Sequence, residues 1–272
     1  MKVAVTGKGG VGKTVIAGTL ACLLQKKGFE VLAVDADPNP NLSYTLGLAR
    51  GEAEKIVPIS ENSELIEEKT GAKPRSYGSV FKLNFTVDDI VEKYAVRTPL
   101  GVNLLVMGVV REAAAGCMCP ANHLLRMLLR HLLVRREEAV VADMEAGTEH
   151  LGRGTAEHVG EMLVVVEPSA KAFETASRIK NLAEQMGGRK ILLVGNKILD
   201  DRDEAAVRSF AEKSGIPVLG TVHYDPAIRE ADLAGVSLLM AAPSAPAVLE
   251  LGQICDRLLE MYTQQDVEQL RE

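Results

Sequence analysis

A glycine-rich loop close to the N-terminus has the residue types and spacing of a phosphate-binding site. The loop is Gly7-Lys8-Gly9-Gly10-Val11-Gly12-Lys13-Thr14, which matches G-x-x-x-x-G-K-[ST] between an expected strand and an expected helix. Glycines let successive backbone N–H groups turn toward phosphate oxygens beside the positive end of the helix. We expect Lys13 to bridge the β- and γ-phosphates of a nucleotide and the Thr14 hydroxyl to bind Mg²⁺. The alternative is a glycine-rich turn that binds no ligand.

Two cysteines in the middle of the chain form a second pattern that could do chemistry. They lie in Gly116-Cys117-Met118-Cys119-Pro120, where burial is not expected beside Gly116 and Pro120. The pair supplies two thiolates, and two such loops facing each other in a dimer would offer four sulfurs, enough for Zn²⁺ or for square-planar Ni²⁺. Pro120 suits the first position of a helix, which places Cys119 near the N-cap, where the helix dipole lowers a thiol pKa. Two buried apolar cysteines or a redox pair are the alternatives, although redox pairs usually have the spacing Cys-x-x-Cys.

The remaining cysteines and two histidines are expected to have ordinary structural roles. Cys22 and Cys255 fall in apolar parts of the first and last expected helices, so we place both in the core. His123 and His131 lie on the helix expected after the cysteine pair, where a partly solvated face explains them.

Short apolar runs alternate with longer helical patterns along most of the chain. The runs expected to be buried strands are Lys2–Thr6, Val31–Val34, Val102–Met107, Ala139–Ala142, Met162–Val166 and Ile191–Val194. The segments expected to be helices are Lys13–Lys27, His123–Arg135, Lys171–Met186, Arg202–Ser214 and Ala247–Thr263. Continuous aliphatic strands are typical of a parallel sheet covered on both faces. We therefore predict an α/β fold with a doubly wound, mostly parallel sheet flanked by helices, and with ligands at the carboxyl ends of its strands.

Residues 49–100 depart from this alternation. They carry many Glu and Lys residues together with Gly and Pro, and they contain no clear buried strand. We expect a helical or loop-rich insertion within a single P-loop NTPase domain that spans residues 1–272, because the chain shows no repeat, low-complexity tract or linker.

Composition and charge exclude several classes of protein. Charged residues make up 25% and hydrophobic residues 47% of the chain, which is ordinary globular usage and argues against disorder. The net charge of −6 argues against a broad nucleic-acid-binding face. No apolar run approaches the ~20 residues needed to cross a bilayer, and the N-terminus lacks the features of a signal peptide. We expect a soluble, cytoplasmic protein that binds neither nucleic acid nor membrane, with its cysteines present as thiols or metal ligands.

The second lysine of the glycine loop gives the motif a particular form. From Lys8 onward, Lys-Gly-Gly-x-Gly-Lys-Thr resembles the deviant Walker A group of P-loop proteins, which includes MinD, ParA and the nitrogenase iron protein. In that group this lysine reaches across a dimer interface to the partner's nucleotide. The resemblance implies an ATPase whose homodimer encloses two ATP molecules and whose assembly follows the ATP or ADP state. Lys8 would then stabilise charge on the transferring phosphoryl group as an arginine finger does. The alternative is that Lys8 is a solvated lysine without such a role.

The two aspartate segments that follow strands fit the same group. Asp35 and Asp37 follow the second expected strand, where the group has its switch I aspartates. The resemblance implies that Asp37 orients the attacking water and that Asp35 acts on the Mg²⁺ shell. Asp143-Met144-Glu145-Ala146-Gly147 corresponds to switch II, in which Asp143 would hold Mg²⁺ through water and the Gly147 N–H would sense the γ-phosphate.

Two later segments resemble the base-binding part of the group. Asn196 is similar to its adenine-reading asparagine, since a side-chain amide offers one donor and one acceptor to a base edge. Asp225 and Arg229 lie in a segment similar to the one that closes over base and ribose. A turn followed by a capped helix explains that segment as well.

The loop, both switch segments and the Cys-x-Cys pair together resemble the CooC family over essentially the whole chain. These are the nickel-insertion ATPases of carbon monoxide dehydrogenase, with a close branch that serves acetyl-CoA synthase. The resemblance implies ATP-driven dimerisation, a Ni²⁺ ion (with Zn²⁺ as a possible substitute) bridged by Cys117 and Cys119 of two chains, and nickel delivery to one of these client enzymes.

Two other functions within the wider group remain as alternatives. A MinD-like positioning ATPase should end in a basic amphipathic helix, whereas residues 264–272 are polar and acidic, and a ParA-like one should carry a basic DNA-binding patch. An electron donor resembling the nitrogenase iron protein holds its cluster with widely separated cysteines, although a [4Fe–4S] cluster on two Cys-x-Cys pairs remains chemically possible.

Overall fold

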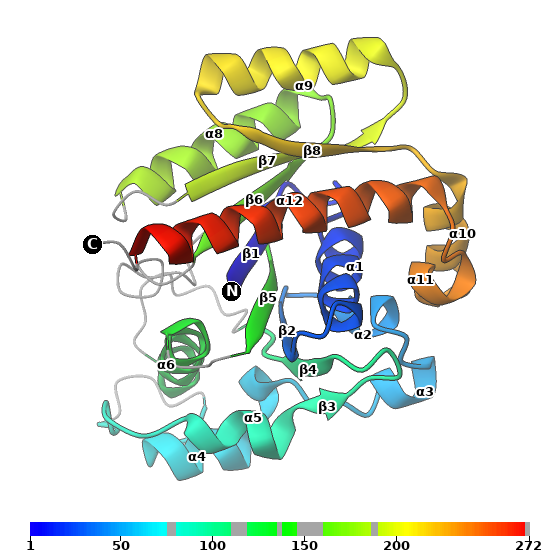
Figure 1. The fold of residues 1–272 in the computed structure, drawn as a ribbon. Coiled ribbons are helices and arrows are strands. Elements are labelled where there is room, and N and C mark those ends of the chain that lie inside the picture. The colour runs from blue at the N-terminus through cyan, green and yellow to red at the C-terminus, as the bar shows by residue number, and fades with distance from the viewer. Residues whose placement is uncertain (75–79, 110–118, 135–137, 146–159, 186–189, 270–272) are drawn as a thin grey trace.

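A computed structural model describes the chain except residues 75–79, 110–118, 135–137, 146–159, 186–189 and 270–272 (Figure 1). The strands are β1 (Lys2–Gly7), β2 (Val31–Ala36), β3 (Val96–Arg97), β4 (Asn103–Val106), β5 (Ala139–Met144), β6 (Glu161–Val166), β7 (Lys190–Ile198) and β8 (Val218–His223). Within the described residues they form one sheet in the order β3-β4-β2-β5-β1-β6-β7-β8. Only the short β3 pairs antiparallel in that part of the chain; the other pairs there are parallel. The predicted doubly wound, mostly parallel α/β fold is therefore confirmed.

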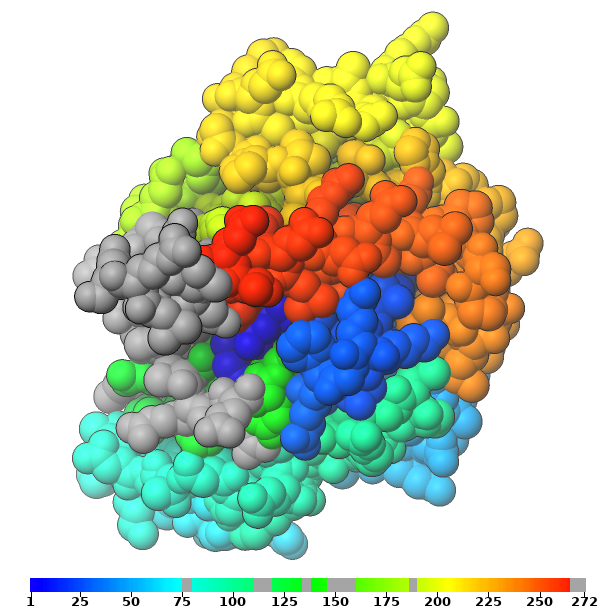
Figure 2. Space-filling model, in the orientation of Figure 1, coloured from blue at the N-terminus to red at the C-terminus, as the bar shows by residue number. Residues whose placement is uncertain are grey.

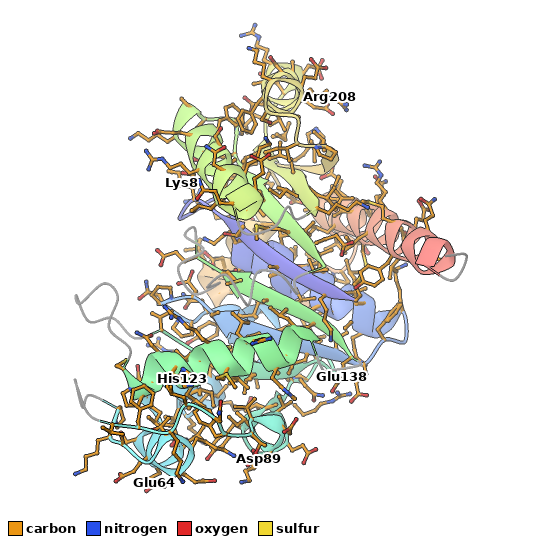
Figure 3. The ribbon with its side chains drawn as sticks, turned by 90° about the vertical axis from the view of Figure 1, so that its left-hand side faces the viewer. Lys8, Glu64, Asp89, His123, Glu138 and Arg208 are labelled. Carbon is orange, nitrogen blue, oxygen red and sulfur yellow. The ribbon has the colours of Figure 1, made fainter. Side chains whose placement is uncertain are left out.

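Helices cover both faces of this sheet. They are α1 (Lys13–Lys26), α2 (Leu42–Thr45), α3 (Arg50–Ala53), the 3-10 turn η1 (Ile59–Glu61), α4 (Ser63–Thr70), α5 (Asp88–Tyr94), α6 (Pro120–Val134), α8 (Ala170–Gln185), α9 (Asp201–Ser214), α10 (Pro226–Ala234), α11 (Leu238–Ala241) and α12 (Pro246–Gln269). The view along the edge of the sheet has α12 on one side and α8 on the other (Figure 3). In the space-filling view α12 forms a long ridge between the α9 region and the blue N-terminal segment (Figure 2). Among the helices described, none combines the length and apolar character that a bilayer span requires.

The predicted strands and helices are present, with bounds that differ by a few residues. Strands β2, β5 and β6 are buried at every position, which explains why they are continuous aliphatic runs in the sequence. The helix expected from His123 begins at Pro120, at the helix position for which proline is suited.

Strand β8 was not predicted, and its environment explains why. It lies at the edge of the sheet, is partly exposed, and contains Gly220, so it lacks the apolar run of a central strand. A Cβ at Gly220 would lie 2.5 Å from Ile254 Cγ1, so glycine allows α12 to pack directly on this strand.

Residues 49–100 contribute to the core as well as to the surface. The described part contains α3, η1, α4, α5 and β3, and the fully buried side chains Ile59, Leu65, Ile66 and Ile90 belong to the same apolar cluster as the sheet. Helix α4 and turn η1 both contact α6, which follows the cysteine pair. That residues 1–272 form one domain with an insertion stays a prediction.

A side chain at Gly220 should disturb the contact between β8 and α12. We expect Gly220→Ala to lower the free energy of unfolding by about 1–3 kcal/mol, because its Cβ overlaps Ile254 within a packed core. Gly252→Ala on α12 is the matched control, since its Cβ would meet nothing within 4 Å and alanine favours a helix. Urea unfolding of both variants tests this, and equal stability of the two would contradict the close packing.

Candidate functional site

The glycine loop turns sharply between β1 and α1, and its glycines are required by position. Gly10 and Gly12 have φ angles of 84° and 96°, which side-chain-bearing residues rarely adopt. A Cβ on Gly7 would overlap the carbonyl oxygen of Val165 on β6, and a Cβ on Gly12 would overlap the Asn196 amide on β7. The loop is thus pressed against the ends of two neighbouring strands, whereas a Cβ on Gly9 would meet nothing within 4 Å.

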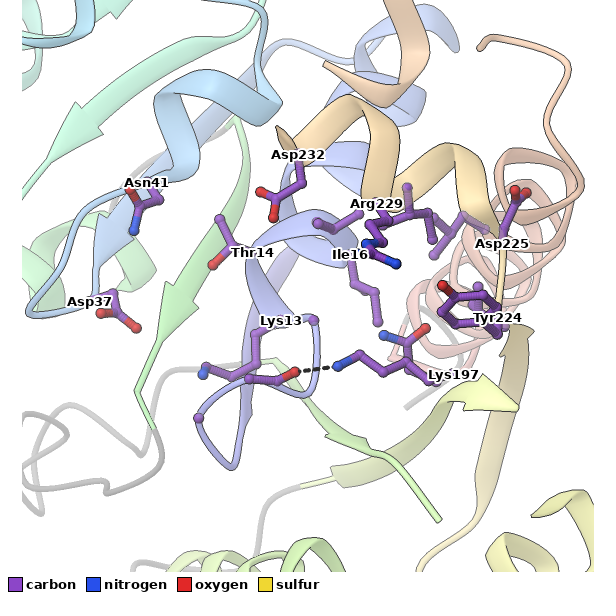
Figure 4. A pocket seen from close by; sticks show the side chains of 18 of the residues that line it. Lys13, Thr14, Ile16, Asp37, Asn41, Lys197, Tyr224, Asp225, Arg229 and Asp232 are labelled. Atoms are coloured by element: carbon purple, nitrogen blue, oxygen red, sulfur yellow. Dashed lines mark hydrogen bonds between the residues drawn. The ribbon is translucent and has the colours of Figure 1, made fainter. Parts of the chain in front are cut away.

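A cavity of about 570 Å³ lies beside this loop, at the carboxyl ends of the strands (Figure 4). Its lining comes from the loop and the first turn of α1, from the segment after β2, from the ends of β5, β7 and β8, and from α10. Lys13, Thr14 and Asp37 line one part of the cavity, and Arg229 and Tyr224 line another. The cavity therefore brings together phosphate-binding groups with an aromatic ring and a guanidinium, a set of groups that can hold the phosphates, ribose and base of a nucleotide.

Asp143 lies at the end of β5, fully buried beside Lys13 and Thr14. Its carboxylate oxygens form no hydrogen bond of good geometry among the described residues, although the Thr14 hydroxyl and the Lys13 ammonium lie close enough to stabilise the charged form. Burial raises the pKa of Asp143 to about 6, and the nearby Thr14 hydroxyl and Lys13 ammonium oppose that rise. A buried carboxylate beside a threonine hydroxyl suits a divalent cation, so these residues fit the Mg²⁺ role expected for them.

Asp35 lies opposite Asp143 in the parallel register of β2 and β5, but it has different partners. Its carboxylate accepts hydrogen bonds from the backbone N–H groups of Leu42 at 2.9 Å and Asp37 at 3.2 Å. Burial raises the pKa of Asp35 to about 7, and the charge of Asp143 adds to the rise, whereas the two backbone donors oppose it. Asp35 thus holds the segment after β2 in place, and any contact with the Mg²⁺ shell stays a prediction.

Asp37 reaches the cavity from that segment. One of its oxygens accepts the N–H of Asn39 at 2.8 Å, and the side chain lines the cavity with Asn39 and Asn41. This placement is compatible with the expected contact to an attacking water. Of the switch II segment, the structure describes Asp143, Met144 and Glu145, and Gly147 lies outside the described residues.

Asn196 and Lys197 on β7 hold the loop from its other side. The Asn196 side chain is buried and donates to the Val11 carbonyl at 2.7 Å, and the Lys197 ammonium donates to the Gly10 carbonyl at 2.7 Å (Figure 4). The Asn196 amide nitrogen therefore supports the loop, and its expected contact with adenine stays a prediction. Lys197 was missed by sequence reasoning, although it directly follows Asn196.

Asp225 lines the cavity and also caps a helix, which was the alternative explanation of its segment; its expected contact with base or ribose stays a prediction. Its two carboxylate oxygens accept the N–H of Ala227 at the start of α10 at 2.9 Å and the N–H of Ala247 at the start of α12 at 3.1 Å. Arg229 lies one turn further along α10 and lines the cavity. Tyr224 was missed because it follows β8, a strand that was not predicted.

Lys8 takes a different direction from Lys13. It does not belong to the cavity lining seen in the described residues; instead its ammonium lies 3.6 Å from the Glu167 carboxylate at the end of β6. Lys8 is labelled beside the glycine loop in Figure 3. The lysine that the resemblance assigns to a partner's nucleotide is therefore held outside the cavity of its own chain.

Of the two cysteines in the Cys-x-Cys pair, the structure describes only Cys119. Cys119 directly precedes α6, and its sulfur accepts the N–H of Asn122 at 3.4 Å, as an N-cap residue does. The expectation that Cys119 would not be buried is wrong: it is 2% exposed, because the first turn of α6 packs into the core. Cys117 lies outside the described residues. Among the residues that are described, no group of three or more His, Cys, Asp or Glu side chains could hold a metal ion. The bridging metal site stays a prediction.

Cys22, Cys255 and His123 contact the protein interior or neighbouring side chains and have no place in the cavity lining seen in the described part of the chain. Cys22 and Cys255 are buried as predicted, and burial raises their thiol pKa values to about 12 and about 11. The His123 ring lies against Phe81 and Phe85, and its Nε2 is 2.8 Å from the carbonyl oxygen of Leu83.

The buried charge of Asp143 should lower the stability of the nucleotide-free protein. Its pKa rises from 3.8 to about 6 on folding, so the cost grows as pH rises from about 4 to about 6 and is complete above that. We expect Asp143→Asn to raise the free energy of unfolding at pH 8 by about 1–3 kcal/mol, and much less at pH 4.5. Urea unfolding of wild type and variant at both pH values measures this.

Asp37→Asn is the comparison for Asp143→Asn, because Asp37 lines the same cavity but is only partly buried. Its charge contributes least to the raised pKa of Asp143, so Asp37→Asn should give a much smaller gain in stability at pH 8. A gain for Asp143→Asn that is equal at both pH values, or no gain at all, would contradict a buried charge at this position.

Comparisons with known proteins agree with this geometry. Residues 2–238 match the family model described as the CobQ/CobB/MinD/ParA nucleotide binding domain. The chain is 46% identical to an uncharacterised ATP-binding protein of Methanocaldococcus jannaschii over 91% of this chain and 95% of that protein. It is 43% identical to the carbon monoxide dehydrogenase accessory protein CooC of Rhodospirillum rubrum over 90% of this chain and 91% of that protein.

Solved structures share the fold at lower sequence identity. The cell division ATPase MinD of Pyrococcus furiosus superposes with a TM-score of 0.66 at 22% identity, covering 96% of this chain and 100% of that one. A ParA family ATPase from Chlorobium tepidum gives a TM-score of 0.67 at 19% identity, covering 93% and 97%. With its sequence relatives and its phosphate loop, the chain belongs to the CobQ/CobB/MinD/ParA nucleotide-binding family, and within it to the deviant Walker A ATPases of the CooC type.

Proposed function

We propose that this ATPase delivers nickel to carbon monoxide dehydrogenase or acetyl-CoA synthase during maturation of the client enzyme. The observation that carries the proposal is the 43% identity to CooC, a carbon monoxide dehydrogenase accessory protein, over 90% of this chain. The Cys-x-Cys pair supports it chemically, because two thiolates per chain suit a soft metal that is bound for transfer. Nickel is the cargo, and Zn²⁺ is a substitute that the same sulfurs would accept.

The cavity supports binding of ATP or ADP in a defined orientation. Backbone N–H groups of the glycine loop and the ammonium of Lys13 would hold the phosphates, and Arg229 and Tyr224 would lie toward the base and ribose. Thr14 and Asp143 would hold Mg²⁺, which neutralises charge on the β- and γ-phosphate oxygens. Asp37 would orient the attacking water from the segment that Asp35 supports.

Assembly into a homodimer supplies the remaining catalytic charge. Within one chain, Lys8 lies near Glu167 and outside the cavity lining, which supports a role at a nucleotide other than its own. In the dimer, Lys8 of each chain would stabilise charge on the partner's transferring phosphoryl group. Closing and reopening of the dimer would bring the two cysteine loops together and apart, and in this way couple hydrolysis to metal transfer.

Removal of the Lys8 ammonium should prevent ATP-dependent dimerisation without unfolding the chain. We expect Lys8→Ala to remain monomeric with Mg-ATP and to lose ATPase activity by about 1,000-fold or more, the effect on kcat of removing an arginine finger that acts in trans. Lys55→Ala, at an exposed lysine on the insertion, is the matched control. Light scattering measures dimerisation, and phosphate release measures ATPase activity. A Lys8→Ala chain that dimerises like wild type would contradict the role of Lys8 at the partner's nucleotide.

Removal of the cysteine pair should abolish metal binding. Anaerobically purified protein titrated with Ni²⁺ or Zn²⁺ should bind one metal ion per two chains, and Cys117→Ala with Cys119→Ala should bind none. Cys22→Ala with Cys255→Ala also removes two thiols, but these lie in separate helices, α1 and α12, and their raised pKa values disfavour the thiolate, so metal binding should persist.

The same titration separates the alternative functions. Unchanged nickel binding in the double variant Cys117→Ala with Cys119→Ala contradicts the metal half of the proposal. Iron and sulfide in the purified dimer would indicate an electron donor resembling the nitrogenase iron protein. No metal at all would leave a MinD- or ParA-like positioning ATPase.

A further inference from the structure

Glu167 lies between two lysines beside the phosphate loop. Its carboxylate Oε1 is 3.6 Å from the Lys8 ammonium, and its Oε2 is 3.8 Å from the Lys197 ammonium. The Ser169 hydroxyl donates to Oε1 at 3.3 Å and helps to orient the group. The three charged side chains come from the glycine loop and from the ends of β6 and β7, so their contact exists only in the folded chain.

The two lysines are held to different degrees. Lys197 donates to the Gly10 carbonyl at 2.7 Å, and its φ of 58° is the one positive φ of a non-glycine residue in the described part of the chain. Such a backbone conformation is unfavourable for a residue with a side chain and persists only where the surroundings impose it, so Lys197 is firmly placed. Lys8 has Glu167 as its one ionic partner among the described residues, at a distance longer than a hydrogen bond.

We propose that Glu167 is a positioning residue that holds Lys8 on its own chain and releases it when two chains assemble. The proposal rests on the proposed role of Lys8 at the partner's nucleotide. In the single chain the Lys8 ammonium lies outside the cavity and is paired with the Glu167 carboxylate. Dimerisation must break this ion pair, so Glu167 weakens assembly and sets the protein concentration at which it occurs.

The charge arrangement makes this release possible at small cost. When Lys8 leaves, the Glu167 carboxylate keeps Lys197 beside it, so no unpaired charge is left. The Lys8 and Glu167 side chains are 35% and 27% exposed. Ion pairs with such access to water contribute little to stability, so breaking this one costs little free energy. Lys197 stays on the Gly10 carbonyl throughout, so the phosphate loop keeps its shape.

The test is the dissociation constant of the dimer with Mg²⁺ and a non-hydrolysable ATP analogue, measured by sedimentation for the full chain. Glu167→Gln removes the charge but keeps the size of the side chain, and it should tighten the dimer about twofold to fivefold. The difference from wild type should shrink at 0.5 M salt, because screening weakens the Lys8–Glu167 pair in wild type. Analogue affinity of the dilute monomer should be unchanged.

Glu174→Gln is the matched control, since Glu174 forms an exposed ion pair with Arg178 on α8 and should leave dimerisation unchanged. A Glu167→Gln dimer that is equal to or weaker than wild type overturns the inference, as does a gain that persists in high salt. Loss of dimerisation in Lys8→Ala with no effect of Glu167→Gln removes the role of Glu167 alone. If Lys8→Ala dimerises as tightly as wild type, both the proposed role of Lys8 and this inference are wrong.

Discussion

The phosphate loop packs so closely against the ends of β6 and β7 that side chains do not fit at two of its positions. Gly7 lies against the Val165 carbonyl, and Gly12 lies against the buried Asn196 amide, which in turn bonds to the loop. This close approach fixes the loop, and so it places Lys13 toward the cavity and Lys8 toward the end of β6. The nucleotide site and the opposite directions of the two lysines follow from one packing constraint.

Two buried aspartates at neighbouring strand ends have different electrostatic roles. Asp35 is satisfied by backbone N–H groups and shapes the segment that presents Asp37, whereas Asp143 forms no hydrogen bond of good geometry in the described chain. Burial raises the pKa of both, which lowers the stability of the nucleotide-free chain. A cation beside Asp143 would offset this cost, so a site built in this way is stabilised by its own ligands.

Strand β5 and helix α6 connect the cavity with Cys119. Strand β5 carries Asp143 at its end and pairs with both β1 and β2, and it follows α6, whose first residue directly succeeds Cys119. Helix α6 also contacts the 49–100 insertion. Asp143 at the cavity and Cys119 at the start of α6 thus belong to successive elements of the chain, and α6 connects both with the insertion.

Local sequence patterns determined much of this protein: the glycine loop, the central strands, the core positions of Cys22 and Cys255, and the start of α6. These features depend on neighbouring residues, whose types and spacing carry the information. Only the tertiary structure decided that β8 forms a partly exposed edge strand, that Cys119 is buried, and that Glu167 meets Lys8. Such contacts join residues far apart in the chain, and a carboxylate that pairs with a distant lysine has the same local pattern as one that is solvated.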